Sequence, residues 1–343
     1  MATRETETGV DSRAIAKRAA FFAVFAVAVV VLLSTLPGVG EVRERLGSAN
    51  PWWLLVVAAF AVWSMLGFVR TLWAAFDRIV PWRRALVLGL AEQGANVLLP
   101  AGGTGGPAFG AYVLTRLGVP AELAAGRHAA LFLCTSVIGF AAVAVAGVLV
   151  AVGVLAGDVS LAASLLPAAG AAALLVLLYV YGRSNPPPEP GGGKLRHTLW
   201  RLRHFAHDGV STTVHLLRHG DRWLIGGAIA YYAADVASLG ASFQAFGGGA
   251  PPVGVFVLAY TLGHAGALIP TPGGVGGTEG GLIGAFAAYG TPISTATAAV
   301  LAYRVFQLGL PAIFGAVSLL RIQRTLAHPP PREQIAARFE GRV

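Results

Sequence analysis

Long apolar stretches alternate with shorter basic stretches along the chain. A helix needs about 20 apolar residues to cross the hydrocarbon core of a bilayer, and six stretches are long enough: 19–36, 51–69, 129–156, 161–181, 223–246 and 293–320. A helix packed in a soluble core would show a polar stripe with a period of 3.6 residues, which these stretches lack. The pattern therefore predicts an all-α fold, a polytopic helical membrane protein with about six full transmembrane spans.

Two further apolar stretches, 86–117 and 253–289, are interrupted by proline and glycine. Proline lacks the backbone N–H and glycine loses the most entropy on ordering, so these breaks cannot continue a helix. The arm 86–99 has 14 residues and would reach only about 21 Å. Both stretches are therefore expected to form re-entrant hairpins. The breaks contain Pro100, Gly102, Gly103, Gly105, Gly106, Pro270, Pro272, Gly273, Gly274, Gly276 and Gly277.

The two breaks form an internal repeat. A shift of 171 residues places the four glycines of the first break on four glycines of the second, and a Gly-x-Pro comes after both copies, at 118–120 and 290–292. Three predicted spans separate the copies, so the two hairpins would enter the membrane from opposite sides. Inverted repeats with broken helices are a transporter architecture. The helix N-termini at such breaks favour an anionic group.

Lysine and arginine gather on one side of this topology. Of the 25 Lys and Arg residues, 20 fall in 1–18, 70–85, 182–222 and 321–343, whereas only Arg43 and Arg45 fall in a loop on the other side. Cytoplasmic loops carry an excess of these residues, so both termini and 182–222 are expected to be cytoplasmic. The formal charge of +9 is therefore explained by membrane topology, and we expect no nucleic-acid partner. The expected organisation is a tail 1–18, a transmembrane domain 19–320 and a tail 321–343.

The segment 182–222 joins a flexible Pro/Gly-rich linker to a basic amphipathic helix. Apolar residues recur at mostly three- and four-residue steps over 195–217, with arginines between them. Such a helix is expected to lie on an anionic leaflet. It also carries five histidines, but no carboxylate or cysteine completes a ligand set, so we expect no metal. These histidines are His197, His204, His207, His215 and His219.

Composition and motifs exclude several kinds of chemistry. Charged residues make up 12% of the chain, against about 25% in a soluble domain. The single cysteine, Cys134, excludes an internal disulfide and a Cys-based metal site. The glycine clusters contain neither a Gly-x-Gly-x-x-Gly after a strand nor a Gly-Lys-Ser/Thr, which argues against nucleotide binding. Because a His-Glu-x-x-His and a nucleophile elbow are also missing, we expect no cofactor and no enzyme activity.

Glu279 and Arg304 are the leading candidates for a substrate-binding site. Glu279 stands beside the second break, and Arg304 lies deep in the last span. Ionisable residues at membrane depth are costly and are functional by default. The alternatives are structural: Glu279 satisfies free N–H groups at a helix N-terminus, or the two residues form a salt bridge that only holds the fold. We expect the pair to meet near the midplane and to hold an anionic headgroup.

Other polar residues inside the membrane are further candidates. Glu92 and Asn96 are four residues apart in the first hairpin, so they share one face of a helix and are expected to line a cavity, although a hydrogen bond between helices explains them as well. Asp235 lies in the span 223–246. Weaker candidates are Arg127, His128 and His264, for which pairing with a backbone carbonyl is the commoner explanation.

A family resemblance rests on the second break and on the residues after it. The chain reads Pro270-x-Pro-Gly-Gly-Val-Gly-x-x-Glu279, then Gly-x-Pro at 290–292, Tyr303-Arg304, and Pro311 with a glycine four residues on. This pattern resembles the lysylphosphatidylglycerol synthase transmembrane (flippase-like) family, and 96–112 resembles its first signature. The resemblance implies a bacterial plasma-membrane protein that moves lipids between leaflets, with Tyr303 at the site. No aminoacyl-transferase domain is expected in this chain, which therefore reads as a stand-alone member.

The chain departs from the family pattern in the first signature. Many members have a Glu and an Arg there, where this sequence has Gly106 and Gly110. The expected function is a flippase-like transporter of an anionic or lipid-linked substrate. The first alternative is a secondary transporter of a small anionic solute, coupled to protonation of Glu279. A third class, an intramembrane enzyme or partner subunit acting on lipid-linked substrates, lacks a catalytic motif in this sequence. The expected partners are membrane lipids, with a homodimer or a separate lipid-modifying enzyme as further possibilities.

Overall fold

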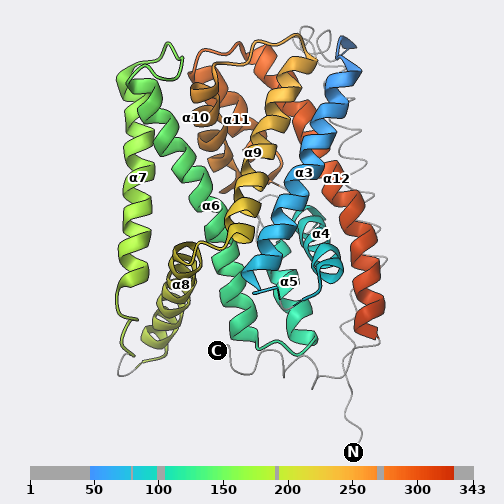
Figure 1. The fold of residues 1–343 in the computed structure, drawn as a ribbon, viewed down its shortest axis with the longest axis vertical. Helices are drawn as coiled ribbons and strands as arrows, with labels where there is room; N and C mark the ends of the chain where they lie inside the picture. The colour runs from blue at the N-terminus through green and yellow to red at the C-terminus, as the bar shows by residue number, and fades with distance from the viewer. Residues whose placement is uncertain (1–46, 79, 99–104, 190–192, 269–273, 328–343) are drawn as a thin grey trace, which may run out of the picture.

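The computed structural model describes residues 47–78, 80–98, 105–189, 193–268 and 274–327, and within these ranges the chain is all-helical (Figure 1). The elements are α3 (Pro51–Ala75), α4 (Trp82–Leu98), α5 (Gly105–Arg116), α6 (Ala121–Ala151), α7 (Leu161–Arg183), α8 (Lys194–Arg218), α9 (Arg222–Ala245), α10 (Val253–Gly263), the 3-10 helix η1 (His264–Leu268), α11 (Gly277–Ala288) and α12 (Ile293–Ala327). This confirms the all-α class. The expected tail 1–18 and span 19–36 lie outside the described residues, as do Pro100, Gly102, Gly103, Pro270, Pro272 and Gly273 of the breaks.

Five helices in the described part of the chain are long and apolar enough to cross a membrane: α3, α6, α7, α9 and α12. They correspond to five of the six expected spans. The span expected at 129–156 was placed too late, because α6 begins at Ala121 and ends at Ala151. Pro120 takes the N-cap position, and a proline there starts a helix without losing a hydrogen bond. Similarly, α12 continues to Ala327, beyond the expected end at 320.

Two pairs of shorter helices occupy the expected hairpin positions. α4 and α5 pack together towards the lower end of the bundle in Figure 1, and α10 and α11 pack together towards its upper end. α5 and α11 have 12 residues each, about 18 Å of helix, which is too short to cross the hydrocarbon core. This arrangement is the one expected of two re-entrant hairpins, whose depth in a bilayer stays a prediction.

The order of helices repeats. α3, α4, α5 and α6 recur as α9, α10, α11 and α12, and the starts of corresponding helices are 171 or 172 residues apart. The two copies run in opposite directions: in Figure 1 α3 descends whereas α9 ascends, and α6 ascends whereas α12 descends. α3 and α9 meet at Gly67, where a Cβ atom would lie 2.5 Å from the backbone nitrogen of Tyr231. The arrangement is therefore an inverted repeat, with its two first helices crossing at close range.

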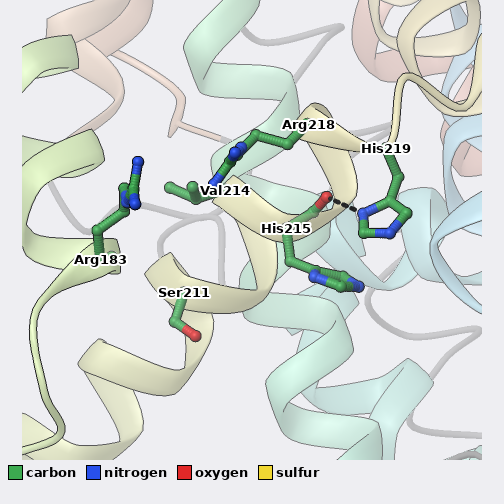
Figure 2. Close-up of a pocket in the computed structure, with 7 residues that line it drawn as sticks. Arg183, Ser211, Val214, His215, Arg218 and His219 are labelled. Atoms are coloured by element: carbon green, nitrogen blue, oxygen red, sulfur yellow. Dashed lines mark hydrogen bonds between the residues drawn. The ribbon is translucent and has the colours of Figure 1, made fainter.

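Helix α8 is amphipathic, as the spacing of its apolar residues predicts, and it packs against α6 and α7. Its second half carries the buried side chains His207, Val210, Thr213 and Leu216. His207 Nε2 lies 2.9 Å from the carbonyl oxygen of Ser184 at the end of α7, and Figure 2 shows the last turns of α8 beside that helix. Only the first half of α8 presents exposed apolar side chains, so the helix is joined to the bundle along its second half.

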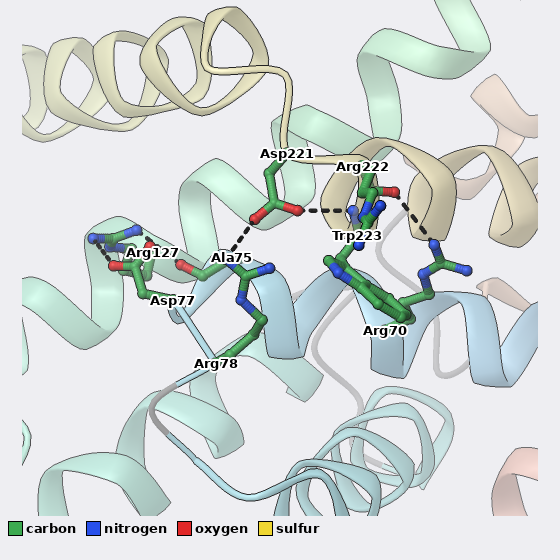
Figure 3. Close-up of polar contacts among 8 residues, drawn as sticks. All are labelled: Arg70, Ala75, Asp77, Arg78, Arg127, Asp221, Arg222 and Trp223. Carbon is green, nitrogen blue, oxygen red and sulfur yellow. Dashed lines mark hydrogen bonds and ion pairs between the residues drawn. The ribbon is translucent and has the colours of Figure 1, made fainter.

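Polar contacts join α3, α6 and α9 at the basic end of the bundle (Figure 3). Arg127 donates to the carbonyl oxygen of Ala75 at 2.9 Å and to Asp77 at 2.8 Å. Arg78 pairs with Asp221, the N-cap of α9, at 3.2 Å. In contrast, the described loops of the opposite end (47–50, 152–160, 246–252 and 289–292) contain no Lys or Arg. This asymmetry agrees with the expected topology, in which the basic end is cytoplasmic.

Candidate functional site

The second break places Glu279 at the start of a helix. Gly274 and Gly276 adopt φ angles of +67° and +85°, which glycine takes readily because it has no Cβ. α11 then begins at Gly277, so Glu279 is its third residue. Its Oε2 accepts a hydrogen bond from the backbone N–H of Gly276 at 2.7 Å. The carboxylate therefore satisfies a free N–H group and lies at the positive end of the helix dipole, as the structural alternative predicts.

The other oxygen of Glu279 pairs with Arg304. Arg304 Nε donates to Oε1 at 2.8 Å, and the two side chains are 7% and 15% exposed. Arg304 lies 11 residues into α12, about 17 Å from its start. The predicted contact between the two residues is therefore confirmed. A buried pair of this kind is costly to break, because removing one partner leaves the other charge uncompensated.

The pair is the outer part of a larger polar network. Arg304 Nη1 donates to Gln307 Oε1, and Gln307 Nε2 donates to Asp235 Oδ2 at 3.3 Å. The same oxygen of Asp235 accepts from the hydroxyls of Tyr303, at 2.8 Å, and Tyr260, at 2.5 Å. Tyr303 is completely buried. Tyr303 and Tyr260 thus hold Asp235, which orients Gln307 and through it the guanidinium of Arg304.

His264 lies at the edge of this network. Its Nδ1 is 2.9 Å from the carbonyl oxygen of Tyr260, so Nδ1 carries a proton, because a carbonyl oxygen only accepts. Its Nε2 is buried and has no partner among the described residues. A buried polar atom without a partner is uncommon in folded proteins. The end of α10 therefore presents one unused polar group next to the Asp235 carboxylate network.

The first hairpin carries a separate pair. Glu92 Oε1 lies 3.0 Å from His128 Nε2, and the residues are 1% and 3% exposed. His128 Nδ1 lies 2.7 Å from the carbonyl oxygen of Ala124 and donates to it. The contact between Oε1 and Nε2 therefore needs a second proton, held by the carboxyl or by the imidazole. Glu92 Oε2 is buried and has no partner among the described residues.

Glycines of α5 close over this pair. The backbone N–H of Gly106 approaches Asn96 Oδ1 at 3.4 Å, and the carboxyl group of Glu92 lies against Gly110. Both side chains therefore face α5, and Glu92 and Asn96 share a helix face as predicted. That face contacts α5 and α6, as the alternative of a hydrogen bond between helices predicts. A Cβ atom on Gly110 would overlap the Glu92 carboxyl group and lie 2.5 Å from His128 Nε2. The absence of a side chain at Gly110 therefore leaves the room that the Glu92–His128 pair occupies.

Each hairpin thus has one carboxyl side chain that pairs with a basic side chain on the next long helix of the chain. Glu92 pairs with His128 on α6, and Glu279 pairs with Arg304 on α12. Sequence reasoning missed Gln307 and Tyr260 and ranked His128 low. Gln307 could have been found from its spacing, because it lies three residues after Arg304 and hence on the same helix face. His128 could not, because its partner is 36 residues away. The substrate-binding roles of these residues stay predictions.

Comparison with known proteins agrees with this architecture. The family model described as lysylphosphatidylglycerol synthase TM region matches residues 21–315, which covers both hairpins and the helices that carry Asp235, Glu279 and Arg304. No curated protein matches the sequence. The chain therefore belongs to the lysylphosphatidylglycerol synthase TM region family and is a multi-pass membrane protein of this flippase-like family.

Proposed function

We propose that the protein moves an anionic or lipid-linked substrate between membrane leaflets, and that Arg304 and Glu279 form its binding site. One observation carries this proposal: a buried arginine is held at a broken helix by a carboxylate and a glutamine. A guanidinium at membrane depth costs free energy, and residues of this kind are usually functional. The planar fork of the guanidinium suits phosphate and carboxylate groups. Localisation in a bacterial plasma membrane, with the basic end cytoplasmic, belongs to the same proposal.

In this proposal Glu279 occupies the site while substrate is absent. An anionic headgroup displaces Glu279 from Arg304, and the carboxylate keeps its second hydrogen bond, to the N–H of Gly276. Gln307 and Asp235 hold the guanidinium in place during the exchange. The positive end of α11 adds a further attraction for the headgroup. The process consists of binding and release and involves no covalent chemistry.

The test is the movement of a fluorescent phosphatidylglycerol between leaflets of proteoliposomes. Arg304→Lys keeps the charge but loses the planar fork of the guanidinium. We expect the rate of lipid movement to fall about tenfold, because the free energy of one hydrogen bond to a charged group corresponds to a change of this size. The matched control neutralises another ion pair of the same length, by Asp77→Asn with Arg127→Gln, and should leave the rate unchanged. Full activity after Glu279→Gln with Arg304→Gln would refute the binding site.

The same vesicles separate this proposal from uptake of a small anionic solute coupled to protonation of Glu279. Both oxygens of Glu279 accept hydrogen bonds from N–H groups, so a proton on this carboxylate would disrupt one of them. Lipid movement should therefore continue without a pH gradient across the vesicle. Solute uptake that requires such a gradient, without any lipid movement, would favour the second function.

A further inference from the structure

A cationic cavity of about 480 Å³ lies where the end of α7 meets the second half of α8 (Figure 2). Its volume is within the range of about 300 to 1,000 Å³ that is common for ligand pockets. Two arginines, two histidines and a serine line it, and no lining residue is acidic: Gly182, Arg183, Ser211, Val214, His215, Arg218 and His219. None of these residues belongs to the Arg304 network or the Glu92–His128 pair.

The two arginines come from different helices. Arg183 ends α7 and donates to the hydroxyl of Tyr179 at 3.0 Å. Arg218 ends α8 and is exposed, and its charge also acts on the hydroxyl of Tyr179. Two guanidinium groups that line one cavity repel each other, and no carboxylate among the lining residues compensates them. An anion bound between them would remove this repulsion, and the guanidinium geometry suits a phosphate group.

The rest of the lining supplies additional donors. Ser211 contributes a hydroxyl to the cavity wall. His219 Nδ1 donates to the carbonyl oxygen of His215 at 3.0 Å, so its Nε2 can donate to an anion only when the ring is charged. The rings of the two histidines are 4.0 Å apart, so both imidazoles gather at one end of the cavity. A phosphate would meet the guanidinium of Arg183 from α7 and the Ser211 hydroxyl and the guanidinium of Arg218 from α8.

The surface beside the cavity is apolar. Val176, Leu177 and Val180 of α7 are 60%, 65% and 60% exposed, and α7 is one of the candidate membrane spans. In a bilayer these side chains contact acyl chains, whereas Arg183 lies at the basic end of the span, at the level of the headgroups. Basic pockets between helices on the cytoplasmic side are typical sites for anionic lipid headgroups.

We propose that this cavity binds the phosphate group of an anionic phospholipid, whose acyl chains lie along the exposed face of α7. The lipid is a resident ligand at the junction of α7 and α8, distinct from a substrate at Arg304. This inference does not depend on transport, because it concerns a different set of residues. Free inorganic phosphate shares the recognised chemistry and is the alternative source of the ligand.

The test is native mass spectrometry of the full chain in a mild detergent, titrated with phosphatidylglycerol. The cavity variant carries Arg183→Gln and Arg218→Gln. The matched control carries Arg83→Gln and Arg84→Gln, which remove two exposed charges from the first turn of α4, outside both the cavity and α8. We expect the affinity for the first bound phosphatidylglycerol to fall about tenfold in the cavity variant and to stay within a factor of about two in the control.

The outcomes separate the alternatives. An unchanged affinity in the cavity variant, or an equal loss in the control, would overturn the proposal, because the lipid would then respond to surface charge alone. A second titration uses inorganic phosphate: binding of phosphate that depends on both arginines and displaces the lipid would assign the cavity to the free ion. If the double variant does not remain monodisperse, Arg218→Gln alone is measured, because this side chain is exposed and its loss leaves the packing of α8 intact.

Discussion

Replacing Gly110 by alanine tests how the first hairpin is packed. The added methyl group would overlap the carboxyl group of Glu92 and lie 2.5 Å from His128 Nε2, so the Glu92–His128 contact must break or the helices must separate. Overpacking costs about 1 to 3 kcal/mol and a lost charged hydrogen bond about 1.5 to 3. The better helix propensity of alanine returns about 1 kcal/mol. The expected destabilisation is therefore about 2 to 5 kcal/mol.

The chain contains its own probe for this measurement. Cys134 is its single cysteine and is completely buried in α6, so a thiol-reactive dye that fluoresces on labelling reports unfolding during heating. At about 2 °C per kcal/mol, the melting temperature should fall by about 4 to 10 °C. The control is Gly126→Ala in the same helix as Cys134, where a Cβ would meet no atom within 4 Å. Its melting temperature should stay the same or rise.

A double-mutant cycle identifies the cause. Glu92→Ala removes the carboxyl group that the new methyl group would overlap and leaves His128 room to shift, so its cost should be smaller in the Gly110→Ala background than in the wild type. We expect a coupling free energy of at least about 1 kcal/mol, as is common for residues in contact. Additive costs, or a melting temperature of Gly110→Ala equal to that of the Gly126→Ala control, would refute the reasoning.

Two further predictions concern the membrane. Asn185 and Asp158 lie in loops at opposite ends of the bundle, and each can be replaced by cysteine after Cys134 has been replaced. An impermeant thiol reagent should label position 185 from the cytoplasmic side and position 158 from the external side. Labelling of position 185 from outside would overturn the topology. Arg196→Glu, Arg201→Glu and Arg203→Glu together reverse three exposed charges on α8. This change should weaken the contact of α8 with anionic lipid by about 1 kcal/mol per charge removed. Unchanged fluorescence quenching by headgroup-labelled anionic lipid would rule this contact out.

Several features of the protein can be derived from the sequence alone. The sequence predicts the bounds of α7 and α9 within two residues and the start of α3, whose end at Ala75 lies six residues beyond the expected 69. The bilayer requires long apolar helices and water does not, which is why these spans stand out. The inverted repeat was predicted from two glycine clusters and the number of spans between them. The pairing of Glu279 with Arg304 was also predicted, because an arginine inside an apolar helix must find an anionic or polar partner.

The boundaries of helices needed the structure, for a physical reason. Hydrophobicity marks where a helix enters the bilayer, whereas the helix itself continues as long as its backbone hydrogen bonds can be made. α6 therefore begins at Ala121, and its first turns carry Arg127, whose charge is balanced by Asp77 of the loop after α3. That contact spans 50 residues of sequence and has no local signal.

The inner polar contacts were likewise decided by tertiary packing. Asp235 receives hydrogen bonds from Tyr260, Tyr303 and Gln307, which lie 25, 68 and 72 residues away along the chain. Gly110 is a helical residue whose lack of a side chain matters only because α4 and α6 bring Glu92 and His128 against it. The sequence determines which segments lie in the membrane and which polar groups need partners. Only the packing of the two repeats decides which partners they obtain, because that depends on distances between helices that are far apart in the chain.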